Sequence, residues 1–127
     1  MRQQSIDIPG ASHKAPLPMA CKVGPMLATS AIGGKDPATG DLPEGIEAQV
    51  ANAFRNLELV LAEAGMDMGD VVKISVLASE ESARDAVNKV WLHYYPDEHK
   101  RPARHTHITT LRGGMLVQLE VLAFDKV

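Results

Sequence analysis

The segment 115–124 constrains the fold of this chain more than any other, because it is apolar on both faces of an extended strand. Five apolar residues alternate along one face and two more lie on the other: Met115, Val117, Leu119, Val121 and Ala123, then Leu116 and Leu122. Two-sided apolarity is typical of a strand that is covered on both sides of its sheet. A chain of 127 residues has little material to cover both sides. The pattern therefore predicts self-association.

The segment before this strand carries the signals of a second strand and a turn. Pro102 favours extended backbone in its neighbourhood, and Gly113-Gly114 supplies turn residues. We therefore predict a β-hairpin that joins a strand at 103–111 to the strand at 115–124. Pairing of these two strands would place Arg104 next to Gln118, at the opening of a shared site where the guanidinium can bind a carboxylate.

Two helices are expected between the other strands. Apolar residues recur every three or four positions from 44 to 64, and Gly65 provides a natural C-terminal stop. Ser79 is the expected N-cap of a second helix, which Pro96 ends. Further strands are expected at four segments, with a loop at 33–40: residues 2–8, 20–23, 26–32 and 71–78.

The resulting element order, β-β-β-α-β-α-β-β, is that of an α+β two-layer sandwich. Both helices would cover one face of a mixed sheet. The chain is expected to form a single domain over residues 1–127, since its length suits one hydrophobic core.

Charge and cysteine content exclude several classes of function. The formal net charge of −3 argues against nucleic-acid binding, which needs a concentrated basic face. A single cysteine, Cys21, leaves no internal disulfide and fits a reducing compartment. No apolar run reaches the ~20 residues that a membrane span requires, and the N-terminus shows no signal segment. A cytoplasmic protein that binds neither membranes nor nucleic acid is expected.

Several short motifs, taken in order along almost the whole chain, resemble the RidA/YjgF family, which is also labelled endoribonuclease L-PSP. The matching segments are Lys22–Ser30, Asp36–Gly40, Asn56-Leu57, Ala64-Gly65, Asp70–Lys73, Asn88 and Arg101–Arg104. The resemblance implies a chorismate-mutase-like fold and a homotrimer with a pocket at each subunit interface. It also implies hydrolysis of reactive 2-imino or 2-enamino acids, such as 2-iminobutanoate and 2-iminopropanoate, to 2-oxo acids and ammonia. No metal or organic cofactor is implied.

The same resemblance assigns site residues one by one. Arg104 matches the arginine that holds the substrate carboxylate. Gln118 stands where well-studied members carry an acidic residue that positions or protonates the attacking water, and an amide cannot titrate. Leu17 replaces the usual pocket aromatic, and Thr106 replaces a cysteine. Ser30 is kept, while Ala31 stands in place of the following glycine.

Each of the chemically suggestive residues also has an ordinary interpretation. Arg104 could form a surface ion pair with Glu44 or Asp97 instead of holding substrate. Gln118 could orient a water or form a hydrogen bond across a subunit interface. Glu120 lies two residues further on the same strand face, about 6.5 Å away, and could serve as the acid or pair with a neighbouring chain.

The histidines and the cysteine are less specific signals. His105 and His107 share a strand face, and His13 could add a third imidazole, but no carboxylate lies at ligand spacing. Ordinary polar or partner-facing roles are favoured over a metal site. Cys21 beside Lys22 could be an activated thiol, and a small packing residue is the preferred interpretation.

Three functions remain for test. The first is a cofactor-free imine or enamine deaminase. The second is a trimer that binds a small carboxylate or ketoacid without turnover, or with altered specificity, because Gln118 replaces the acid. The third, an RNA-directed role, is disfavoured by the acidic composition.

Overall fold

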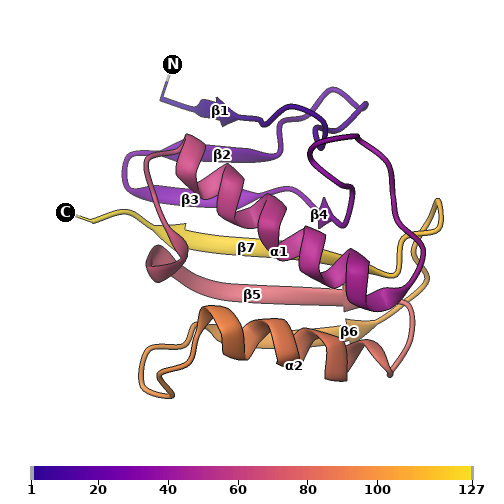
Figure 1. Cartoon of the computed structure of the whole chain (residues 1–127). Coiled ribbons are helices and arrows are strands. Elements are labelled where there is room, and N and C mark those ends of the chain that lie inside the picture. Colours follow the sequence, from indigo (N-terminus) through magenta and orange to yellow (C-terminus); the bar gives the residue numbers. More distant parts are fainter. Residues whose placement is uncertain (1, 127) are drawn as a thin grey trace.

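The computed structural model describes residues 2–126, which form one mixed β-sheet covered on one face by two helices (Figure 1). The described elements follow the order β1 Gln4–Ile6, β2 Ala20–Val23, β3 Met26–Thr29, β4 Ile32–Gly33, α1 Ile46–Glu63, the 3₁₀ helix η1 Met68–Asp70, β5 Val71–Ala78, α2 Ala83–Tyr94, β6 Ala103–Ile108 and β7 Val117–Phe124. The α+β class, the mixed sheet and the placement of both helices on one face are confirmed. The short β4 and η1 were not expected.

The sheet has the strand order β1-β2-β3-β7-β5-β6. β2 and β3 form a hairpin, in which Val23 pairs with Met26 and Gly24 adopts a φ of 57° at the turn. β3 and β4 pair in succession with β7, so the run predicted at 26–32 is split into two strands. β5 pairs antiparallel with β7 and parallel with β6.

The predicted hairpin between the last two strands is wrong. β6 is an edge strand, and β5 lies between it and β7. The helix α2 connects β5 to β6 as a parallel crossover, which needs a helical connection of this kind. β7 then crosses beyond β5 and takes the central position, where its apolar residues are buried. Gly113-Gly114 therefore lies in the loop at 109–116, which carries the chain from β6 past β5 to β7, and does not form a tight hairpin turn.

Both helices lie where the apolar periodicity predicts them, but the start of the second is displaced. Ser79 is not its N-cap: the N–H of Ser79 donates to the carbonyl of Leu116 at 3.1 Å, and α2 begins after Ser82. Ser79 directly follows β5, and this backbone hydrogen bond continues the pairing of β5 with the segment before β7. Ser79 therefore cannot begin the helix. Gly65 follows α1 with a φ of 73°, as its predicted role requires.

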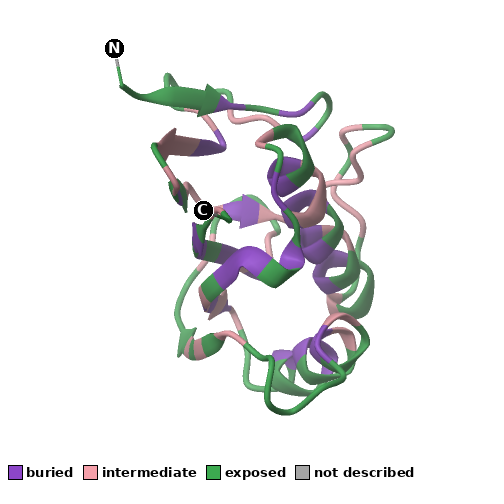
Figure 2. Cartoon of the chain, turned by 90° about the vertical axis from the view of Figure 1, so that its left-hand side faces the viewer, coloured by how far each residue is buried: buried purple, intermediate pink, exposed green. Residues whose placement is uncertain are grey.

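The core lies between the sheet and the helices (Figure 2). Four residues of β7 are buried on this side: Val117, Leu119, Val121 and Ala123. The opposite side of β7 carries Gln118, Glu120, Leu122 and Phe124, of which the last two are 40% and 47% exposed. A single chain therefore covers one face of the final strand and leaves the other open.

Candidate active site

Arg104 lies on the edge strand β6 and its side chain turns toward the helix layer. Its register partner on β5 is Ile74, which is fully buried in the core, so the two residues share the helix-facing side. An Nη of Arg104 donates to the side-chain oxygen of Asn88 at 2.5 Å, and its guanidinium carbon lies 5.0 Å from the ring centroid of Trp91. Both partners come from α2. The helix therefore holds the guanidinium by one hydrogen bond and a cation–π contact.

Arg104 has no carboxylate counter-ion among the described residues. Partial burial, and then repulsion by Arg84, lower the pKa of the Arg104 guanidinium below its ordinary value. A guanidinium nevertheless stays protonated at neutral pH. Within residues 2–126 it forms no ion pair with a carboxylate, so the alternative pairing with Glu44 or Asp97 is not found. The contact with Asn88 uses one of its five N–H donors.

Thr106 shares the face of Arg104. It pairs with Val76 of β5, a core residue, and is half-buried. The expected alternation of β6 therefore holds, although its neighbour strand is not the one predicted.

Gln118 lines a pocket on the other face of the sheet, close to the short strand β4. Gly33 of β4 lies directly opposite Gln118. The pocket has a volume of about 330 Å³ and is walled by a loop, by residues in and around β4, and by the start of β7 with its approach: residues 11–15, Ala31, Gly33, Lys35, Met115 and Gln118. The Nε2 of Gln118 donates to the Sδ of Met115 at 3.0 Å, so the amide oxygen is the atom left to accept from a ligand or water.

The walls of this pocket are fixed by polar side chains of α1. Asn56 is fully buried and donates to the carbonyls of Gly33 and Lys35 at 3.0 and 2.8 Å. Gln49 is 1% exposed, donates to the carbonyl of Gly114 and accepts from the N–H of Leu116. These bonds tie the segment after β4 and the approach to β7 to one rigid helix.

The other predicted pocket residues lie on the approach to β4. Ala31 lines the pocket, whereas Leu17 is 43% exposed in the preceding loop and is not among the lining residues. The hydroxyl of Ser30 donates to the carbonyl of Pro18 at 2.8 Å, and its N–H donates to the carbonyl of Met19. Ser30 therefore joins this loop to the end of β3, and its hydroxyl oxygen can still accept.

Glu120 lies on the same face of β7 as Gln118, as expected, but lines different hollows. Its register partner is Ser75, and His107 and Lys73 border the adjoining depressions. The carboxylate is exposed and lies outside the pocket of Gln118. Within one chain it is a surface group of the open sheet face.

Arg104 and Gln118 do not meet within one chain. β5 separates their strands, and their side chains lie on opposite sides of the sheet. The prediction that Arg104 and Gln118 lie side by side on neighbouring strands is therefore wrong for the single chain. Two half-sites result: the Arg104 guanidinium of β6, which is held against α2, and the Gln118 pocket on the open face of the sheet.

His105 and His107 lie on one face of β6, with ring centroids 4.0 Å apart. Within residues 2–126, no three His, Cys, Asp or Glu side chains converge as a metal site would require. His13 lies elsewhere, in the Gln118 pocket. Cys21 is a free, partly buried thiol of β2.

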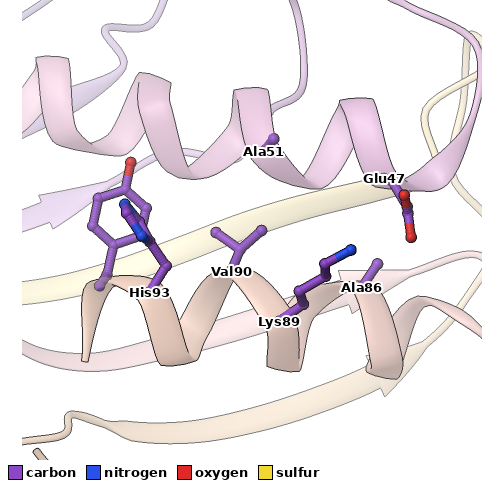
Figure 3. Close-up of a pocket in the computed structure, with 7 residues that line it drawn as sticks. Glu47, Ala51, Ala86, Lys89, Val90 and His93 are labelled. Atoms are coloured by element: carbon purple, nitrogen blue, oxygen red, sulfur yellow. The ribbon is translucent and has the colours of Figure 1, made fainter. Parts of the chain in front are cut away.

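A separate hollow of about 380 Å³ runs between α1 and α2 on the outer side of the helix layer (Figure 3). Glu47 and Ala51 face it from α1, and Lys89, Val90 and His93 face it from α2. None of the residues singled out in the sequence for carboxylate chemistry lines it. None of the described helices is long and apolar enough to cross a membrane.

Residues on both half-sites escaped the sequence reasoning. Asn88 was noted as part of the motif set, but its contact with Arg104 depends on the β5-α2-β6 crossover. Trp91 gives no functional signal, because an aromatic residue on the apolar face of a helix is ordinarily a core residue. Lys14 and Lys35 gave no signal, because single lysines in loops are ordinary, and only folding gathers them around Gln118.

The fold and the two half-sites define a class: small α+β proteins with a mixed sheet, one open sheet face and, at the sheet edge, an arginine with no carboxylate partner among the described residues. The sequence matches the family described as Endoribonuclease L-PSP over residues 11–125. A RutC family protein of Aquifex aeolicus is 31% identical over 87% of this chain and 93% of its own length. The chain therefore belongs to the RidA/YjgF family.

Two further relatives relate the family to chemistry and to structure. The 2-iminobutanoate/2-iminopropanoate deaminase of Mus musculus is 31% identical over 85% of this chain and 80% of its own length. The crystal structure of YyfA from Yersinia pestis, described as a protein of unknown function of the conserved Rid family, superposes with a TM-score of 0.88 at 29% identity. The alignment covers 96% of this chain and 98% of that one.

Proposed function

We propose that this protein hydrolyses reactive 2-imino or 2-enamino acids to 2-oxo acids and ammonia, without a cofactor. The observation that carries the proposal is the guanidinium of Arg104, which has no carboxylate partner among the described residues and is held by Asn88 and Trp91. Such a group is prepared to bind the planar carboxylate of a small substrate through two parallel hydrogen bonds. The name of the mouse relative supplies the reaction class.

The reaction needs a carboxylate anchor and a placed water. The water oxygen bonds to C2, the π electrons of the C=N bond move to nitrogen, and one water proton passes to that nitrogen. The C–N bond then breaks while the remaining hydroxyl proton passes to nitrogen and the C2–O bond becomes a carbonyl, so that ammonia and the 2-oxo acid are formed. An enamine first gains a proton at C3 and loses one from nitrogen, which converts it to the imine. Gln118 can orient the water through its amide oxygen, but it cannot exchange a proton with it at neutral pH.

A complete site requires a second copy of the chain in this proposal. Arg104 and Gln118 lie on opposite sides of one sheet, so one substrate can contact both only if they come from different chains. The open face of β7, with exposed Leu122 and Phe124, is the surface through which copies would pack. A homotrimer with a site at each interface satisfies both requirements.

The second candidate is a trimer that binds a small carboxylate or 2-oxo acid without turnover. Gln118 favours it, since no titratable carboxylate lines the pocket. This candidate predicts carboxylate binding through Arg104 with no catalysed release of ammonia.

Ammonia release from an imino acid generated in the reaction mixture separates the candidates. Arg104→Ala should keep the fold and abolish catalysed release, and Arg104→Lys should restore little because an ammonium replaces the planar fork. Arg55→Ala is the matched control, since Arg55 is exposed on α1 and pairs with Glu58. Equal activity in wild type and Arg104→Ala would refute the anchor. Lost activity in Arg55→Ala would indicate a general effect of removing surface charge.

A further inference from the structure

The pocket around Gln118 is lined by basic groups and by no acidic one. Three of its lining residues, His13, Lys14 and Lys35, are basic, and neither aspartate nor glutamate is among the described residues that line it. The chain as a whole has a formal net charge of −3, so this local excess runs against its composition. A concave surface of one sign concentrates ligands of the opposite sign.

The side chains of these basic residues form no ion pair with the described residues. Among residues 2–126, neither Lys14 nor Lys35 forms an ion pair, although five contacts between a lysine or arginine and a carboxylate occur elsewhere. The Nε2 of His13 is buried and has no hydrogen-bond partner in the described part of the chain. A buried polar nitrogen without a partner is uncommon and indicates a missing ligand or water.

The backbone that carries Lys35 is rigidly placed. Its carbonyl accepts from Asn56 at 2.8 Å, and the carbonyl of Gly34 accepts from Asn52 at 3.1 Å. A Cβ atom on Gly34 would lie 2.4 Å from the carbonyl oxygen of Gln49, so this segment packs directly on α1. The loop therefore holds the base of the Lys35 side chain at the pocket wall, which lowers the ordering cost of binding.

We propose that this pocket binds a second anionic group of the substrate, so that the preferred substrate is a 2-imino or 2-enamino acid with a further carboxylate on its side chain. The inference rests on the proposed function: Arg104 of one chain holds the carboxylate next to C2, and His13, Lys14 and Lys35 of another hold the distal carboxylate. Because the amide of Gln118 is neutral, it does not repel the distal carboxylate. A carboxylate at the same position would repel it.

The test compares two imines made in place by an amino-acid oxidase, one from alanine and one from aspartate. Wild type should show a kcat/KM at least about tenfold higher for the dicarboxylic imine, and the ratio should fall with rising salt. The double change Lys14→Ala with Lys35→Ala should remove most of this preference. Lys89→Ala is the matched control in the hollow between the helices, and it should leave the ratio unchanged.

A ratio unaffected by the double change, or a wild type that prefers the imine from alanine, would overturn the inference. A binding measurement separates its failure from failure of the proposed function. If wild type hydrolyses neither imine but binds 2-oxoglutarate at least about tenfold more tightly than 2-oxobutanoate, and the lysine changes remove that difference, the second anion site stands and the deaminase proposal falls. Equal affinity for both oxo acids would contradict the second anion site.

Discussion

At the scale of single residues, the chemistry of the proposed site depends on the amide at position 118. Gln118 shares its pocket with His13, Lys14 and Lys35, so a carboxylate introduced there would be held ionised by its neighbours. An ionised carboxylate can accept a proton from the attacking water, which an amide cannot do.

Gln118→Glu should therefore raise the rate of ammonia release from a monocarboxylic imine. Proton transfer by a placed side chain contributes ~10²–10⁴-fold, so even a partly aligned glutamate should be visible above spontaneous hydrolysis. The same change should lower kcat/KM for the imine derived from aspartate, because the new charge opposes the distal carboxylate. If Gln118→Glu changed kcat/KM equally for both imines, it would contradict the proposal that a glutamate at this position helps proton transfer but repels the distal carboxylate.

Glu120→Gln tests whether the acid lies two residues further along β7. Glu120 is exposed beside Ser75 and outside the pocket, so we expect activity to remain within about threefold of wild type. The measurement is ammonia release with the monocarboxylic imine at neutral pH. Loss of activity in this variant alone would place the acid at Glu120 and would require the open face of a neighbouring chain to bring it to the substrate.

At the scale of elements, the periodicity of the chain predicted the helices and most strands because those signals are local. Along β7, for example, the buried residues Leu119 and Val121 alternate with the exposed Glu120 and Leu122, as a half-buried strand requires. Pairing was not local: the β6–β7 hairpin was wrong because sequence neighbours need not be sheet neighbours when a helical crossover intervenes. Arg104 was found from its motif, but its contact with Asn88 required the correct topology.

The end of α2 provides a prediction on stability and pH. The buried hydroxyl of Tyr95 donates to the carbonyl of Met68 at 3.0 Å and joins the end of α2 to η1. Burial, and then the nearby Tyr94 and Asp67, raise the pKa of the Tyr95 phenol above its ordinary value. The folded state therefore favours the neutral phenol. Its contribution to stability is full below the unfolded pKa of about 10 and is lost as pH rises above it.

Tyr95→Phe should lower the free energy of unfolding by about 1 kcal/mol at pH 7, where the hydrogen bond is intact. The difference from wild type should shrink above about pH 10, because the unfolded wild type gains stability by ionising its tyrosine. Urea unfolding at pH 7 and pH 10.5 measures both values. A difference that stays constant across this range would contradict the raised pKa of Tyr95.

At the scale of the whole molecule, the open face of the sheet is the surface through which copies of the chain would assemble and bring the two half-sites together. Met26 and Phe124 are register partners there, and Leu122 lies beside them; the three are 41%, 47% and 40% exposed. Apolar residues gathered on one face of a sheet are typical of an interaction surface. The two-sided apolarity of the final strand predicts self-association through such a surface, but the pattern carries no information on how many copies assemble.

We expect light scattering to give three times the 13.7 kDa of one chain at micromolar concentration. Leu122→Asp should dissociate the assembly, because it would bury an unpaired carboxylate, and should abolish ammonia release by separating Arg104 from the Gln118 pocket. Leu92→Asp is the matched control: Leu92 is 54% exposed on α2, so this variant should keep both mass and activity. A wild-type monomer with full activity would contradict the shared site, because one chain holds its two halves on opposite sides of the sheet.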